Sequence, residues 1–136
     1  ITLGVFVLGE AGMAISDKPW SQFSESDYNL DQWYEACLIK PPKSEYTAKA
    51  QAKLPVREPD GTLNRNGVHA AAAALAGARG GVKASTEEKR KAARALIRLY
   101  RELGEEPPES IKRIAEWTSR MSAVLRWNNL ANSHEP

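Results

Sequence analysis

The residues from Ser85 to Gly104 restrict the fold more than any other part of the chain, because they carry the signals of one long helix. Ser85 or Thr86 can cap its first turn, where two glutamates favour the positive end of the helix dipole. Gly104 is the type of residue that ends a helix. Apolar side chains recur at helical spacing between these ends: Ala92, Ala93, Leu96, Leu99, Tyr100 and Leu103. The sequence therefore predicts a helix over residues 86–103 with one buried stripe.

Three other segments have helical patterns that are bounded by caps, glycines or prolines. The first follows Asn29, an N-cap candidate, and stops at two prolines. The second is an alanine-rich run that ends at a glycine, and the third follows another pair of prolines. The expected helices span residues 30–39, 68–76 and 109–127.

The remaining segments predict extended or irregular structure. Residues 1–8 are apolar and β-branched around a glycine, which is typical of a short strand or a packing arm. Residues 40–53 are polar and rich in lysine, as in a mobile linker, and the prolines that follow exclude an ordinary helix. The chain has 136 residues, enough for one domain. The sequence predicts a mainly α fold of about four helices, with an extended N-terminal arm or short strand and a proline-rich loop.

These patterns divide the chain into three parts. Residues 1–52 hold the arm, a short helix and the linker, residues 53–109 form a helical domain, and residues 110–136 form a C-terminal amphipathic helix and tail. Charge is distributed unevenly, because the net charge of +2 combines −5 over residues 1–38 with +7 over residues 39–136. The acidic front of one copy can meet the basic back of a neighbour, so we expect a homo-oligomer or a larger assembly.

Arginines recur every three or four residues along the 86–103 helix, on a different face from its apolar stripe. Four guanidinium groups on one face can neutralise phosphates, so nucleic-acid binding is the alternative function that the sequence offers. The competing interpretation is a solvated face, because glutamates four residues away in the same helix can pair with part of this charge. The candidate phosphate-binding residues are Arg90, Arg94, Arg98 and Arg101.

Large apolar side chains outside the long helix fit either a core or a surface for a protein partner, since both need the same pattern. They lie in the irregular segment 16–29, in the 30–39 helix and along the 109–127 helix. The candidate interface residues are Trp20, Phe23, Trp33, Ile111, Ile114, Trp117, Met121, Val124, Leu125 and Trp127.

Residue types that perform catalysis or bind metals are sparse. The two histidines, His69 and His134, belong to no cluster with the spacing of metal ligands, and His69 is expected to pack or cap at the start of its helix. Cys37 is the single cysteine and is expected to be a small buried hydrophobe. The adjacent glutamates at 87–88 and 105–106 suit helix dipoles and solubility better than acid–base chemistry. The sequence therefore predicts no enzyme activity, catalytic residue, metal site or cofactor.

The sequence also predicts no membrane segment. The longest apolar run, residues 1–8, is far shorter than the roughly 20 residues of a membrane span. It lacks the basic residues that begin a signal peptide. A single cysteine allows no intramolecular disulfide, which fits a reducing cytoplasm.

Residues 53–109 contain an ordered set of short motifs. They are a Lys-Leu-Pro start, an Asp-Gly turn, a valine before an alanine-rich run, a glycine break, a helix ending in Leu-x-x-Tyr-Arg, and an acidic residue before two prolines. These motifs occupy Lys53-Leu54-Pro55, Asp60-Gly61, Val68 with Ala70 to Ala74, Gly80-Gly81, Ile97-Arg98-Leu99-Tyr100-Arg101 and Glu106-Pro107-Pro108. In this order they resemble a small domain of undetermined biochemistry that recurs in tailed-bacteriophage head proteins. Ile97 stands where the family pattern has leucine, a mild departure because the two side chains are similar in volume.

The resemblance implies a part in phage head assembly, because such domains are attached to, or encoded beside, capsid proteins and head maturation proteases. Those proteases need a separate β-rich domain with catalytic histidine and serine, for which this chain leaves no room. The resemblance thus implies a non-enzymatic accessory module, scaffold-like or decorating, which assembles on a shell with capsid or other head proteins. It also implies a place in the virion or in the cytoplasm of the bacterial host.

Overall fold

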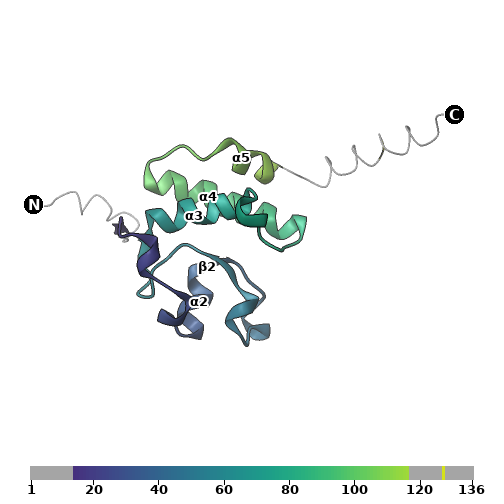
Figure 1. Cartoon of the computed structure of the whole chain (residues 1–136). Coiled ribbons are helices and arrows are strands. Elements are labelled where there is room, and N and C mark those ends of the chain that lie inside the picture. The colour runs from purple at the N-terminus through teal and green to yellow at the C-terminus, as the bar shows by residue number, and fades with distance from the viewer. Residues whose placement is uncertain (1–13, 117–126, 128–136) are drawn as a thin grey trace, which may run out of the picture.

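The computed structural model describes residues 14–116 and residue 127, and this part of the chain is mainly α with two small two-stranded sheets (Figure 1). The helices are α2 (Leu30–Ala36), α3 (Arg65–Leu75), α4 (Thr86–Leu103) and α5 (Glu109–Glu116). The strands are β1 (Ile15–Ser16), β2 (Cys37–Ile39), β3 (Lys53–Pro55) and β4 (Leu63–Asn64). The expected mainly α class is confirmed.

Helix α4 begins and ends where its sequence signals predict. The N–H of Glu88 donates to Ser85 Oγ (3.1 Å) and the N–H of Ser85 donates to Glu88 Oε1 (2.9 Å), which closes a capping box. Gly104 ends the helix with a φ of 77°, a conformation that glycine adopts without strain. All six residues of the expected apolar stripe are buried. The helix predicted over residues 86–103 is confirmed.

Helix α3 begins three residues earlier than the alanine-rich run indicates. The side chain of Asn64 accepts the N–H of Gly67 (2.8 Å) and so caps a first turn that starts at Arg65. Gly67 faces the Trp20 ring so closely that a Cβ would lie 2.9 Å from the ring carbons, which explains a glycine inside this helix. Buried alanines further along α3 let it pack closely against α4.

The helix expected over residues 30–39 is wrong in its last three residues. These form strand β2, which pairs antiparallel with β3 in the register Cys37↔Pro55 and Ile39↔Lys53. Cys37 and Ile39 are buried and Leu38 between them is half-buried, an alternation that a strand produces and a continued helix would not. The expected division between residues 52 and 53 falls inside this pair, so residues from both sides of it share one sheet.

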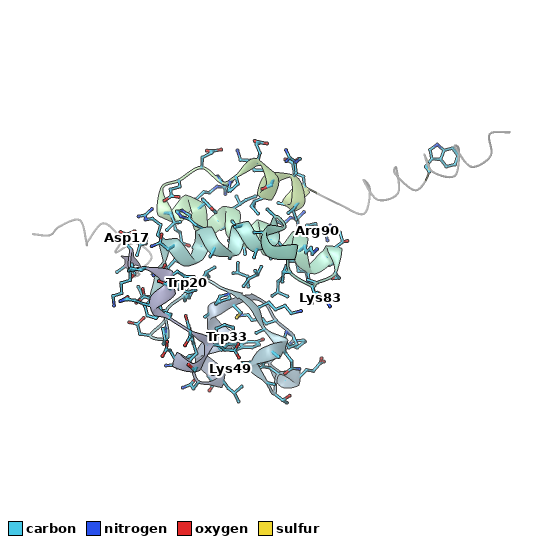
Figure 2. All side chains as sticks on the ribbon, viewed as in Figure 1. Asp17, Trp20, Trp33, Lys49, Lys83 and Arg90 are labelled. Carbon is cyan, nitrogen blue, oxygen red and sulfur yellow. The ribbon has the colours of Figure 1, made fainter. Side chains whose placement is uncertain are left out.

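The lysine-rich segment between β2 and β3, where the sequence predicts a mobile linker, contains local structure and is hydrogen-bonded to α2. It contains two short 3-10 turns, Lys43–Glu45 and Lys49–Gln51. The indole N–H of Trp33 donates to the carbonyl oxygens of Lys49 (3.0 Å) and Ala52 (3.2 Å). Trp33 and Lys49 lie together in the lobe that contains α2 (Figure 2). One buried indole therefore ties the segment to α2.

Two clusters of buried side chains hold these elements together. The larger lies among α3, α4, α5 and the strands, and its fully buried members include Leu63, Val68, Leu96 and Ile111. The smaller lies beside α2, where the rings of Tyr28 and Trp33 meet edge to face with centroids 5.0 Å apart. Figure 1 shows α3 and α4 between α5 and the lobe of α2. Most of the apolar burial that stabilises the fold is thus in the helical layer.

Some expectations concern residues outside the described part of the chain: the strand or arm at residues 1–8, and most of the last helix beyond Glu116. Within the described part, β1 pairs in parallel with β4, with Ile15 opposite Leu63. Helix α5 packs on α4 through the buried side chain of Ile111. The first residues of the expected C-terminal part, 110–116, therefore share a core with residues 53–109.

Candidate functional site

The four arginines that the sequence singles out lie along α4, and we call them the arginine face (residues 90, 94, 98 and 101). Three of them are exposed, whereas the side chain of Arg90 is only 16% exposed. Arg90 forms an ion pair with a glutamate one turn earlier. Arg94 donates from Nε to the carbonyl oxygen of Ala115 (3.3 Å). Arg98 and Arg101 are exposed, and within residues 14–116 neither side chain forms a hydrogen bond or an ion pair. Two of the four candidate phosphate-binding arginines are thus bonded within the chain, and the other two are available to bind a partner.

A hollow lies on each side of the arginine face. One, of about 440 Å³, lies between α4 and β2 and is lined in part by Arg98, Glu102 and Cys37. The other, of about 350 Å³, lies beside Arg101 and is bordered by Pro107 and other residues near the start of α5. Each combines apolar side chains with a charged rim, and arginine is enriched where protein interfaces are buried. Basic side chains outnumber acidic ones only around the hollow of about 440 Å³. That hollow suits a protein partner that presents an apolar side chain beside carboxylates.

Most candidate interface residues within the described part belong to the core. Four of them lie in or against the buried clusters: Phe23, Trp33, Ile111 and Ile114. Trp20 is half-buried beside α3, and Trp127 is 70% exposed. The others lie outside the described residues: Trp117, Met121, Val124 and Leu125. The expectation of a partner surface is therefore corrected at Trp33 (8% exposed) and Ile111 (0%), because helical spacing does not distinguish a core from an interface.

A charged cluster that no sequence pattern indicated lies at the N-terminal end of α3. Arg65 donates from Nε to Asp17 Oδ1 (2.6 Å) and from Nη1 to Glu105 Oε2 (2.5 Å). The other oxygen of Glu105 lies 2.7 Å from His69 Nε2, and the His69 ring stacks on Tyr100. Figure 2 shows Asp17 beside this end of α3. The members of this cluster come from three separate segments of the chain. The sequence indicates the cluster only through the four-residue spacing that puts Arg65 and His69 on one helix face.

This cluster holds the carboxyl of Glu105 in its ionised form. Hydrogen bonds from His69, and then from Arg65, lower the pKa of Glu105 below its ordinary value. Hydrogen bonds to Asp17 and Glu105 raise the pKa of the Arg65 guanidinium. The shared carboxylate therefore joins the loop after α4 to α3, and the packing role expected for His69 fits this geometry.

We expect Glu105→Gln to lower the free energy of unfolding by about 1 kcal/mol at neutral pH, as partly exposed ion pairs do. The pKa of Glu105 is depressed in the folded state, so its stabilisation is complete above the unfolded pKa and is lost as the pH falls through the folded value. The difference between wild type and variant in urea unfolding should therefore shrink between about pH 7 and about pH 3. Glu102→Gln is the control, because the exposed Glu102 side chain has no hydrogen bond or ion pair within the described residues. An equal loss in this control would contradict the role of the cluster.

Cys37 borders the larger hollow but is itself buried. Burial raises the pKa of its thiol to about 12. A thiol that stays protonated at neutral pH is a poor nucleophile and a poor metal ligand. The structure therefore places Cys37 where the sequence expects it, as a small buried hydrophobe.

The Cys37 thiol should react with an aromatic disulfide reagent on the order of a hundredfold more slowly in the folded than in the unfolded chain. The released chromophore, followed in buffer and in urea at about pH 8, measures both rates. Because Cys37 is the single cysteine, the signal reports one site. Equal rates would mean that the hollow exposes a reactive thiolate, contrary to the structure.

Residues 14–116 and 127 contain no group of three or more His, Cys, Asp or Glu side chains placed to hold a metal ion. No helix in this part of the chain has the length and apolarity needed to cross a membrane. No protein-family model, curated protein or solved structure matches the chain.

Proposed function

We propose that the chain is a non-enzymatic structural or assembly module of a tailed-phage head and that it acts through protein–protein contacts. Its support begins with the ordered motifs of residues 53–109, which resemble a domain of phage head proteins. The observation that carries the proposal is how the fold uses these motif residues. Leu54, Val68 and Tyr100 are buried, and Gly61 and Gly81 form turns with positive φ. Motif residues that are buried or form turns determine the fold, so the residues that bind a partner must be exposed ones.

The arginine face supplies the contact surface in this proposal. Arg98 and Arg101 are free to bind carboxylates of a partner, and the hollows beside them can receive apolar side chains. The partners are capsid or other head proteins, and the module itself forms an oligomer or assembles on the shell. It acts in the virion or in the cytoplasm of the bacterial host.

Co-expression with the capsid protein of the same phage genome tests this function. The chain is expected to sediment with capsid particles through a density gradient. Arg98→Glu combined with Arg101→Glu should return it to the top fractions, because reversed charges repel the carboxylates of the partner. Lys83→Glu, the same kind of charge reversal at an exposed lysine that is not among these arginines, should leave sedimentation unaltered. A wild-type chain that stays at the top of the gradient would contradict the proposal.

Light scattering across a salt series, with and without duplex DNA, separates this function from nucleic-acid binding. A defined oligomer that ignores DNA is the expected result. A monomer that binds DNA at low salt and releases it at high salt would favour the alternative, in which the available arginines contact phosphates. In that case Arg94→Glu combined with Arg98→Glu should abolish the binding.

A further inference from the structure

Among the described residues, two side chains with a charged or amide group are buried, and they contact each other. Glu58 is 4% exposed and Asn64 is 0% exposed, and Asn64 Nδ2 donates to Glu58 Oε2 (2.9 Å). The Nζ of Lys18 lies 3.9 Å from the other oxygen of Glu58. The parallel pair β1 and β4 produces this juxtaposition, because Ser16 lies opposite Asn64 and Lys18 follows two residues later. A lysine, a buried carboxylate and a buried amide therefore lie next to one another beside the β1–β4 pair.

The amide of Asn64 is held at both of its polar atoms. Oδ1 accepts the N–H of Gly67 (2.8 Å), a donor that also stabilises negative charge developing on this oxygen. Nδ2 donates to Glu58 and to the carbonyl oxygen of Lys18 (3.1 Å). The carboxylate thus lies beside the nitrogen that would leave if Cγ were attacked, which is where a general acid is needed.

We propose that Lys18 and Asn64 join in an intramolecular isopeptide bond and that Glu58 carries the proton for this reaction. The carboxylate of Glu58 first takes a proton from the Lys18 ammonium. The neutral amine attacks Cγ of Asn64, so that the Nζ–Cγ bond forms and the electron pair of the carbonyl moves to Oδ1 beside the Gly67 N–H.

The tetrahedral intermediate then breaks down without any further reactant. Glu58 gives its proton to Nδ2, the carbonyl re-forms, the Cγ–Nδ2 bond breaks and ammonia leaves. The remaining extra proton on Nζ passes to the departing ammonia, which becomes ammonium, and Glu58 is again a carboxylate. One side-chain ammonium and one amide become one substituted amide and one ammonium ion, with no oxidation or reduction.

The Lys18 side chain must move before this reaction, first to Glu58 and then to Cγ of Asn64. The Lys18 side chain is 62% exposed, so its ammonium must approach Glu58 from 3.9 Å to hydrogen-bonding distance and give up water. The main chain of Lys18 is already fixed by its bond from Asn64. Because amine and amide belong to one folded chain, their encounter is intramolecular and carries the rate advantage of proximity.

The product would be a covalent link between residues 46 positions apart. It would fix the segment before α2 to the start of α3, and a cross-link of this kind restricts the unfolded chain. This modification is independent of the proposed function, because it follows from residues that lie away from the arginine face.

The intact mass of the purified full-length chain tests the proposal. The folded wild type is expected to weigh less than its sequence by one ammonia, and digestion should yield a branched peptide that joins Lys18 to Asn64. Lys18→Arg and Glu58→Gln should each keep the full sequence mass, while circular dichroism shows that both fold. Lys43→Arg, at an exposed lysine away from this site, should still lose ammonia.

Three results would overturn the proposal in whole or in part. If the folded wild type keeps its full mass after prolonged incubation, no isopeptide bond forms, and Glu58 and Asn64 have only a structural role. Loss of ammonia that persists in Lys18→Arg would assign it to succinimide formation at an asparagine. If Glu58→Gln lost ammonia at the wild-type rate, Glu58 would not carry the proton in this reaction.

Discussion

Ile111→Ala is expected to lower the free energy of unfolding of the isolated chain by about 3 kcal/mol. Ile111 is fully buried and packs α5 against α4 within the larger core cluster. Removing most of this side chain costs its transfer from water and leaves a cavity, because neighbouring helices relax only in part. Urea unfolding followed by circular dichroism measures the change.

Arg113→Ala on the same helix is the matched control, because Arg113 is exposed and its loss should alter the free energy of unfolding by less than about 0.5 kcal/mol. This pair of variants distinguishes a core from a partner surface. A side chain that served only a partner would leave the unfolding of the isolated chain unchanged when truncated. Similar, small effects of both variants would therefore contradict the packing of α5 on α4.

Local signals explain why one helix could be predicted residue by residue. The α4 helix has a capping box, an unbroken apolar stripe and a terminating glycine within 20 neighbouring positions of the sequence, and the structure uses all three. Each signal acts through neighbours on the same helix, so the sequence alone contains the relevant partners. The start of α3 was missed by three residues because its cap, Asn64, also ends a strand.

The strand at residues 37–39 depends on a partner that the local pattern does not contain. Leu30, Trp33 and Cys37 have helical spacing, and a short apolar run fits either a helix or a strand. The outcome is decided by β3, which comes after the lysine-rich segment and pairs with these residues. Propensity over a few residues is a weak preference, and pairing between distant segments overrides it.

In the candidate site too, some features could be predicted from neighbouring residues, and others depend on segments far apart in the sequence. The arginines of α4 were visible as a helical row, and the structure leaves three of the four exposed. Arg90 is engaged by a glutamate of the same helix, whereas Arg94 is engaged only because α5 packs nearby and accepts its hydrogen bond. The cluster of Asp17, Arg65 and Glu105 joins three distant segments and had no local signal beyond a helical spacing.

The largest single loss of stability is expected from Trp33→Ala, at about 4 kcal/mol. The Trp33 ring is the largest buried side chain of the smaller cluster and meets Tyr28 edge to face. Its indole N–H also satisfies two carbonyl oxygens of the lysine-rich segment, so alanine would leave both without this donor. Urea unfolding gives the free energy, and hydrogen exchange gives the protection of residues 40–52.

Trp33→Phe separates the two contributions, because phenylalanine keeps an aromatic ring but has no N–H. We expect it to lose about 2 kcal/mol, from the smaller ring and from the carbonyl oxygen of Ala52, which is left without this donor. The carbonyl oxygen of Lys49 still accepts the N–H of Ala52 (2.9 Å). Protection from hydrogen exchange should fall in residues 40–52 for both variants, since the donor is missing in each, while protection in α4 should fall far less with phenylalanine. Full protection of residues 40–52 in Trp33→Phe would mean that ring packing alone holds this segment. If Trp33→Ala left the free energy of unfolding unchanged, Trp33 would belong to a partner surface, as its place among the candidate interface residues allows, and not to the core.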